Sequence, residues 1–219
     1  MGNQMFCFQC EQTAGCKACT GASGVCGKKA DTAELQDQLT GALIGLARSI
    51  EGNEELVTSE THKLVLEALF TTITNVNFNN ETIAALIDRV KAEKERLVPR
   101  CFGCSSACGR NDDYDMQRLW NADEDIRSLK SLILFGIRGV AAYAYHAAVL
   151  GYTDESINNF FFKALFAIGM DDWGMDELLP IVLEVGEVNL KCMALLDKAN
   201  TETYGNPVPI EVSITVEKG

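Results

Sequence analysis

Apolar residues recur with helical periodicity over most of the chain after residue 30. In residues 31–50 they return every three or four positions and form one stripe, made of Leu35, Leu39, Ala42, Leu43 and Leu46. Asp31 precedes Glu34 by three residues, which is the spacing of a capping box. The pattern therefore predicts a helix over residues 31–50.

Two more helices are expected before residue 100. The segment 59–74 has an apolar face that contains Leu64, Ala68 and Leu69. A further helix is expected from about residue 81 to residue 97, with Asn80 as its N-cap. Pro99 would end it, because the residue before a proline is disfavoured in helical conformation.

A segment rich in Cys, Gly, Ser and Asp, residues 101–122, separates these helices from a second set. The pattern predicts this second set at residues 123–151, 154–168 and 175–199. Gly136 and Gly139 lie in the middle of the first of them, where each glycine costs about 1 kcal/mol relative to alanine. We expect the backbone there to pack closely against a neighbour.

The fold class expected from these elements is all-α, with two three-helix bundles behind an N-terminal cysteine-rich loop. The corresponding segments are a loop at 1–30, a first bundle at 31–100, a connector at 101–122, a second bundle at 123–205 and a tail at 206–219. The tail alternates Val212, Ile214 and Val216 and is strand-like. Because a lone strand is not stable, the tail would either pair within this chain or begin a further domain.

Composition narrows the functional classes. The 219 residues are 47% hydrophobic, which suffices for a substantial core, and the net charge of −12 argues against a nucleic-acid surface. No run approaches the roughly 18 apolar residues of a membrane span, and no secretory signal is visible. We therefore expect a cytoplasmic protein that binds neither membranes nor nucleic acids.

Nine cysteines in such a chain point to metal binding or redox chemistry, because thiols stay reduced in the cytoplasm. The number is odd, so they cannot all pair internally. A disulfide-bonded loop is the alternative if the protein is exported.

Five of the cysteines lie in one short stretch, "MFCFQCEQTAGCKACTGASGVCG", at residues 5–27; they are Cys7, Cys10, Cys16, Cys19 and Cys26. Few apolar residues accompany them, and several glycines make the backbone costly to order. A bound metal would supply the missing free energy, because metal binding and folding are then one process.

Two kinds of metal centre fit this stretch. Zinc favours paired Cys-x2-Cys units, which Cys7/Cys10 and Cys16/Cys19 provide, although the gap between the pairs is short for a zinc ribbon. An iron–sulfur cluster takes four cysteines with one Cys-x2-Cys start and looser spacing afterwards, which the spacing favours. Spacing does not decide which of the five is left out.

Several motifs resemble the hybrid cluster proteins, a family also called prismane proteins or hydroxylamine reductases. They are "MFCFQCEQTAG", "GVCGK", "TAELQDQL", "LFTTITNVNF", "DEDIRSLKSLILFGIRGVAAYAYHAAVLG" and "MALLDKANTETYGNP". The resemblance implies that Cys7, Cys10, Cys19 and Cys26 bind a [4Fe–4S] cluster, with [2Fe–2S] as the alternative. Cys16 would then be an extra thiol beside the site.

The resemblance also implies a role. In the family, this region is a helical first domain whose cluster passes electrons inward, and later domains carry the catalytic hybrid cluster that reduces hydroxylamine or nitric oxide. This chain ends about where the second domain would begin, so no catalytic residue is assigned. We expect an electron-transfer domain whose partners are a redox donor protein and the missing catalytic domains. The alternative is a zinc-stabilised helical interaction module.

Other residues carry weaker expectations. Cys101, Cys104 and Cys108 are spaced Cys-x2-Cys-x3-Cys, which suggests either a second metal site or free thiols in a flexible loop. Cys192 is expected in the core. His146 is expected to be buried and hydrogen-bonded, and His62, near a helix start, to be solvated.

Overall fold

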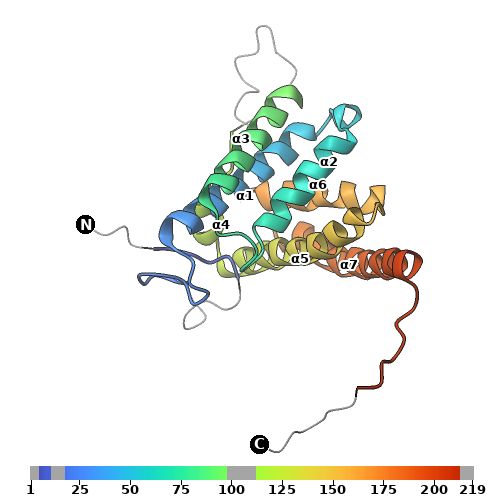
Figure 1. Cartoon of the computed structure of the whole chain (residues 1–219). Coiled ribbons are helices and arrows are strands. Elements are labelled where there is room, and N and C mark those ends of the chain that lie inside the picture. The colour runs from blue at the N-terminus through green and yellow to red at the C-terminus, as the bar shows by residue number, and fades with distance from the viewer. Residues whose placement is uncertain (1–4, 11–17, 98–111, 213–219) are drawn as a thin grey trace, which may run out of the picture.

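The computed structural model of the chain describes residues 5–10, 18–97 and 112–212. Within these ranges the fold is all-α, as expected, and Figure 1 shows the arrangement of the helices. The elements are α1 (Ala30–Ile50), the short 3-10 helix η2 (Glu54–Leu56), α2 (Ser59–Thr71), α3 (Asn80–Leu97), α4 (Met116–Trp120), α5 (Glu124–Val149), α6 (Glu155–Gly169) and α7 (Met175–Tyr204). Of these, α4 was not expected, because it is short and lies in the polar connector.

The helices pack around one continuous apolar core. Helices α5 and α7 lie side by side along one edge of the molecule, and α1 packs between α3 and α6 (Figure 1). Helix α2 also crosses α5. All seven α-helices contribute buried side chains to this core, including Leu43, Leu69, Val90, Ile137 and Phe161. The expected division into two bundles stays a prediction.

The helix ends follow local hydrogen bonds that the sequence pattern predicted only in part. The capping box expected at Asp31 is wrong: α1 begins at Ala30 without a side-chain cap, and the Asp31 carboxylate accepts from the Thr32 N–H. Asn79, one residue before the predicted cap, accepts from the Thr82 N–H at 3.0 Å and starts α3.

The C-terminus of α5 was predicted well. Gly151 adopts a positive φ of 85°, its N–H donates to Ala148 O and the Tyr152 N–H donates to Ala147 O. These two bonds satisfy carbonyls that the last turn leaves open, and glycine is favoured because a side chain would strain this conformation.

The two glycines of α5 differ. A Cβ on Gly136 would lie 2.4 Å from Cγ1 of Val185 on α7, so the predicted close approach is confirmed there. A Cβ on Gly139 would meet no atom within 4 Å, so for Gly139 the prediction is wrong. Gly136 therefore lets α5 and α7 approach, whereas Gly139 leaves open space.

Helix α5 is long and apolar enough, by length and composition alone, to cross a membrane. Part of its apolar surface lies in the core, because α5 packs against α2, α6 and α7, whereas Leu132 and Val149 are exposed. A core helix commonly meets the same criteria.

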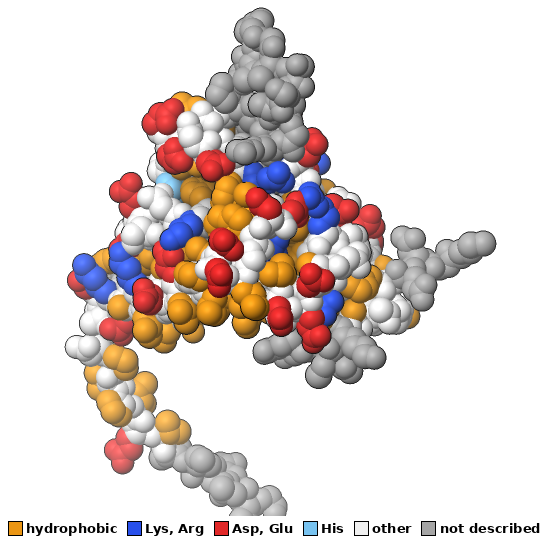
Figure 2. Space-filling model, turned by 180° about the vertical axis from the view of Figure 1, so that it is seen from behind, with side chains coloured by type: hydrophobic (Ala, Val, Ile, Leu, Met, Phe, Trp, Pro, Cys, Tyr) orange, Lys and Arg blue, Asp and Glu red, His pale blue; other side chains and the backbone are white. Residues whose placement is uncertain are grey.

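Helix α7 carries a second apolar stripe on its outward face. Leu179, Leu183, Leu190 and Met193 are 50%, 64%, 69% and 44% exposed. Figure 2 shows hydrophobic side chains gathered along the edge of the molecule that α5 and α7 form. Beyond α7, residues 205–212 form no strand, so the strand expected in the tail is not found there; Ile214 and Val216 lie outside the described residues.

Candidate functional site

The cysteine loop lies against the N-terminal end of α1 (Figure 1). Its two described pieces meet at Cys7 and Cys19, which exchange backbone hydrogen bonds of 3.0 and 2.9 Å in an antiparallel bridge. Both cysteines are buried, in a small apolar group with Met5 and Ala33. Two cysteines that are 12 positions apart in the sequence are thus brought together by the backbone.

Cys10 and Cys26 lie at the margins of this arrangement and are partly exposed. Cys26 sits in a turn in which the Gly24 N–H donates to Lys28 O at 2.8 Å and Gly27 has a φ of 85°. A Cβ on Gly24 would be 3.4 Å from the Cys26 sulfur, so this glycine packs directly beside the thiol.

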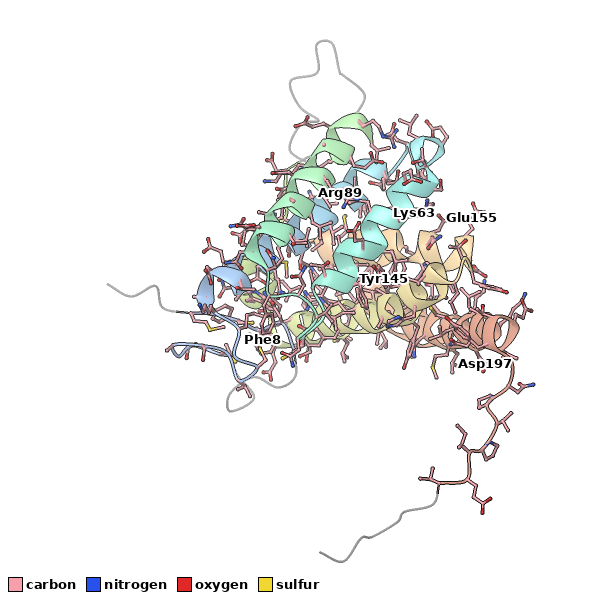
Figure 3. The ribbon with its side chains drawn as sticks, viewed as in Figure 1. Phe8, Lys63, Arg89, Tyr145, Glu155 and Asp197 are labelled. Carbon is pink, nitrogen blue, oxygen red and sulfur yellow. The ribbon has the colours of Figure 1, made fainter. Side chains whose placement is uncertain are left out.

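Phe8 holds the cysteine loop to the helical core. Its side chain makes an edge-on ring contact with Trp120 of α4, with ring centroids 5.3 Å apart. Figure 3 shows Phe8 between the loop and the helices. The apolar contact holds the segment that carries Cys7 and Cys10 to the helical core.

A buried lysine ties the loop to α1. The Lys28 ammonium donates to the side-chain oxygens of Gln9, at 2.7 Å, and of Gln36. The Gln9 amide in turn donates to Ala33 O at 2.8 Å and to the Asp37 carboxylate at 2.7 Å. A buried ammonium is costly unless it is hydrogen-bonded, so this network fixes both ends of the loop.

Arg138 of α5 reaches the same loop from the other side. The residue is 4% exposed, and its guanidinium donates to Gln9 O at 2.8 Å, to the Thr40 hydroxyl at 3.2 Å and to the Thr72 hydroxyl at 3.1 Å. Burial lowers the pKa of Arg138 to about 10, while Asp37, Cys7 and Cys10 act in the opposite direction. At neutral pH Arg138 is therefore a buried cation beside the loop.

Burial raises the pKa of two acidic groups at this site, Cys7 in the loop and Asp37 on α1. Burial raises the pKa of the Cys7 thiol, although the Lys28 charge and the Gln9 N–H both favour the thiolate. Burial likewise raises the pKa of Asp37 to about 6, against the opposing effect of the Gln9 hydrogen bond. A thiolate at Cys7 thus needs additional positive charge, which a metal ion provides.

Cys10 and Arg138 also line a common cavity of about 340 Å³. Ile73 and Thr74 close it on the α2 side, and α5 provides the remaining wall, which includes the open position above Gly139. The thiol of Cys10 is therefore reachable from a space that a cation borders.

The structure tests the predicted ligands only in part. None of the five described cysteines forms a disulfide. Among the described residues no three His, Cys, Asp or Glu side chains are grouped to hold a metal ion, so the four-cysteine ligand set stays a prediction. Cys16, Cys101, Cys104 and Cys108 lie outside the described residues.

Of the predictions for Cys192, His146 and His62, the first is confirmed and the other two are wrong. Cys192 is fully buried and its thiol donates to Val140 O at 3.5 Å, so it is a core residue as expected. His146 is exposed, so its predicted burial is wrong: it lies on the outer face of α5 and makes an edge-on contact with Phe70. His62 is only partly exposed, contrary to prediction, because it packs against Phe162; burial lowers its pKa.

Sequence reasoning missed Gln9, Lys28 and Arg138. Arg138 had a visible signal, a single basic residue inside the apolar run "LFGIRGVAAYA". Such a residue rarely lies in a core unless it is paired. Gln9 and Lys28 carry no comparable signal.

The chemistry of the donor set fits an iron–sulfur cluster. The structure describes four of the loop's five cysteines, and two of these four are buried. Two buried cations, Lys28 and Arg138, are hydrogen-bonded to Gln9, which lies between Cys7 and Cys10. Thiolate clusters carry net negative charge, which nearby cations stabilise. The fold and loop therefore define a helical, cysteine-loop protein suited to a thiolate-bound cluster.

The chain belongs to the Prismane/CO dehydrogenase family, whose model matches residues 5–219. Proteins of this family bind iron–sulfur clusters. The chain is 42% identical to a hydroxylamine reductase of Porphyromonas gingivalis (strain ATCC BAA-308 / W83) over 234 residues, which cover 99% of this chain and 42% of that protein. It is 41% identical to a hydroxylamine reductase of Clostridium novyi (97% of this chain, 42% of that protein) and 39% identical to one of Methanocella arvoryzae (98% and 44%). The chain thus spans less than half the length of these relatives.

Proposed function

We propose that the chain is an iron–sulfur electron-transfer domain that serves the reduction of hydroxylamine or nitric oxide in a hydroxylamine-reductase-type protein. Cys7, Cys10, Cys19 and Cys26 would hold the cluster, which we take to be [4Fe–4S]. When bound, such a cluster accepts and donates single electrons. The observation that carries the proposal is the burial of Cys7 and Cys19 side by side, with Lys28 and Arg138 supporting the segment between Cys7 and Cys10.

The residues of this chain have separate roles in the proposal. The backbone hydrogen bonds between Cys7 and Cys19 set the spacing of two ligands, and the turn from Gly24 to Lys28 positions Cys26. Cys10 is partly exposed, and the surface around the cavity that it lines is the proposed docking place of a redox donor protein. The reduction itself would take place in the part of the relatives that this chain does not span. We further propose that the protein acts in the cytoplasm.

The direct test is anaerobic purification followed by iron, sulfide and zinc analysis and EPR spectroscopy. We expect about four iron atoms and four sulfides per chain, together with a brown colour that dithionite bleaches. Bound zinc in a colourless protein would support the alternative, a zinc-stabilised interaction module, and would refute the proposal. Iron well above four per chain would indicate a second centre, for which Cys101, Cys104 and Cys108 are candidates.

Two matched serine variants distinguish a cysteine that binds the cluster from a cysteine that only packs in the core. Cys7→Ser should lose most of the iron, because it removes a ligand, whereas Cys192→Ser should keep it, because Cys192 lies in the helical core. Equal iron content in the two variants would contradict the ligand assignment. The purified chain should also show no robust turnover of hydroxylamine.

A further inference from the structure

The hydrogen bonds of Arg138 join parts of the chain that are far apart in sequence. One leads to the Gln9 carbonyl in the cysteine loop, one to Thr40 on α1 and one to Thr72 at the end of α2. Gln9 lies between Cys7 and Cys10, so the guanidinium fixes the backbone of that short segment directly. In the described part of the loop, the side chains of Gln9 and Lys28 form hydrogen bonds with each other and with α1, and none of these bonds leads to α5.

All three described acceptors of Arg138 are uncharged, since they are one carbonyl and two hydroxyls. The side chain is nevertheless buried. A buried cation without an anionic partner is strongly unfavourable, so a compensating negative charge is expected close by. The acidic groups that act on Arg138 are Asp37, whose carboxylate accepts a hydrogen bond from Gln9, and Cys7 and Cys10, which become negatively charged when they bind a metal.

The position of Arg138 also gives it access to the thiol side of the loop. It lines the same cavity of about 340 Å³ as Cys10 and Gln9. Gly139, the next residue of α5, lines this cavity too and has no atom within 4 Å of its ideal Cβ position. The helix thus presents a cation, next to a residue without a side chain, toward Cys10.

We propose that Arg138 is a positioning residue for the cluster: it clamps the Cys7–Cys10 backbone through Gln9 and its buried charge raises the reduction potential of the bound cluster. This inference rests on the proposed iron–sulfur function. Reduction adds one electron to a centre that is already negative, and a nearby buried cation stabilises the reduced form more than the oxidised form.

The experiment compares two buried cations on the same helix. Arg138→Met removes the charge at the loop, and Lys130→Met removes a buried cation whose ammonium donates to Met170 O. Both proteins are purified anaerobically and titrated with EPR detection. We expect the potential to fall in Arg138→Met and to stay at the wild-type value in Lys130→Met. Iron release to a chelator should be about 10-fold faster in Arg138→Met.

Arg138→Lys separates the effect of the positive charge from the effect of the hydrogen bonds that hold the loop. The ammonium keeps the positive charge but cannot reach three acceptors with the fixed geometry of a guanidinium. We expect its potential to stay near the wild-type value while hydrogen exchange of the Gln9 and Cys10 amides becomes faster. If Arg138→Met matches Lys130→Met in potential, iron release and amide exchange, the inference is overturned.

Two further arms cover the remaining outcomes. If Arg138→Met does not fold, a Thr40→Val/Thr72→Val double variant removes two acceptors and keeps the cation; faster exchange at Gln9 supports the clamp and unchanged exchange refutes it. If the wild-type chain binds no iron, the proposed function fails. Amide exchange in the metal-free chain then still decides whether Arg138 holds the loop.

Discussion

Asp154 stabilises the start of α6 and links it to α7. Its carboxylate accepts from the N–H groups of Ser156 and Ile157 at 2.9 and 3.3 Å, and it forms an ion pair with Lys191 at 2.9 Å. Burial alone would raise the pKa of Asp154, but the hydrogen bonds from Ser156, Lys191 and the backbone outweigh it and lower the pKa to about 2. The ionised form is therefore the one that the fold favours.

Asp154→Ala should lower the free energy of unfolding at pH 7 by about 1–2 kcal/mol, the usual cost of a lost N-cap. Because the pKa of Asp154 is depressed in the folded state, its contribution is complete above the unfolded pKa near 4 and is lost as the pH falls through about 2. The difference in free energy of unfolding between wild type and variant, measured with urea, should thus become smaller from pH 5 to pH 2. Asp197→Ala, at an exposed position of α7, is the control, and an equal loss there would contradict the argument.

At the scale of helices, the two glycines of α5 offer a matched pair. Gly136→Ala should destabilise the chain by about 1–3 kcal/mol, because its Cβ would overlap Cγ1 of the buried Val185 at 2.4 Å. Gly139→Ala should be neutral or stabilising by up to about 1 kcal/mol, because alanine is the better helix former and the position is open. Thermal unfolding followed by circular dichroism measures both, and equal effects would show that propensity rather than packing governs this helix.

The helices could be predicted from sequence because apolar periodicity and the glycine after α5 are local signals. Their mutual arrangement could not, as α7 shows. It has one apolar face made of Leu178, Ile181, Val185 and Cys192, which is buried, and another that contains Leu183 and Leu190, which is exposed. Periodicity finds both faces but does not say which packs on α5. The same limit applies to Gly136 and Gly139, which differ only in their neighbours.

At the scale of the whole molecule, the cysteines were recognisable from spacing, whereas their surroundings were not. The contacts that hold the loop come from Arg138, which is 129 positions from Gln9, and from Lys28 and Gln36. Such contacts depend on the packing of α1, α2 and α5, and no short motif encodes them. The position of the loop therefore depends on the helical core as well as on the loop's own residues.

The organisation of the core predicts how the molecule responds to loss of its metal. The large apolar core draws on all seven α-helices and contains none of the four predicted ligands, while Cys7 and Cys19 belong to a separate small group with Met5 and Ala33. Removal of the iron by a chelator should consequently leave the helical circular dichroism signal nearly unchanged, since the free energy of helix packing comes from the large core.

The loop should respond differently, because its small apolar group buries too little surface to order it without metal. We expect amide exchange in residues 5–10 and 18–28 to become much faster after chelation, while protection in α1 and α5 persists. Hydrogen exchange with mass spectrometry on the holo and chelated chain measures both regions in one sample. If α1 and α5 lose protection together with the loop, then metal binding and the folding of the helical core form one cooperative unit, and the separation of the two apolar groups has no energetic meaning.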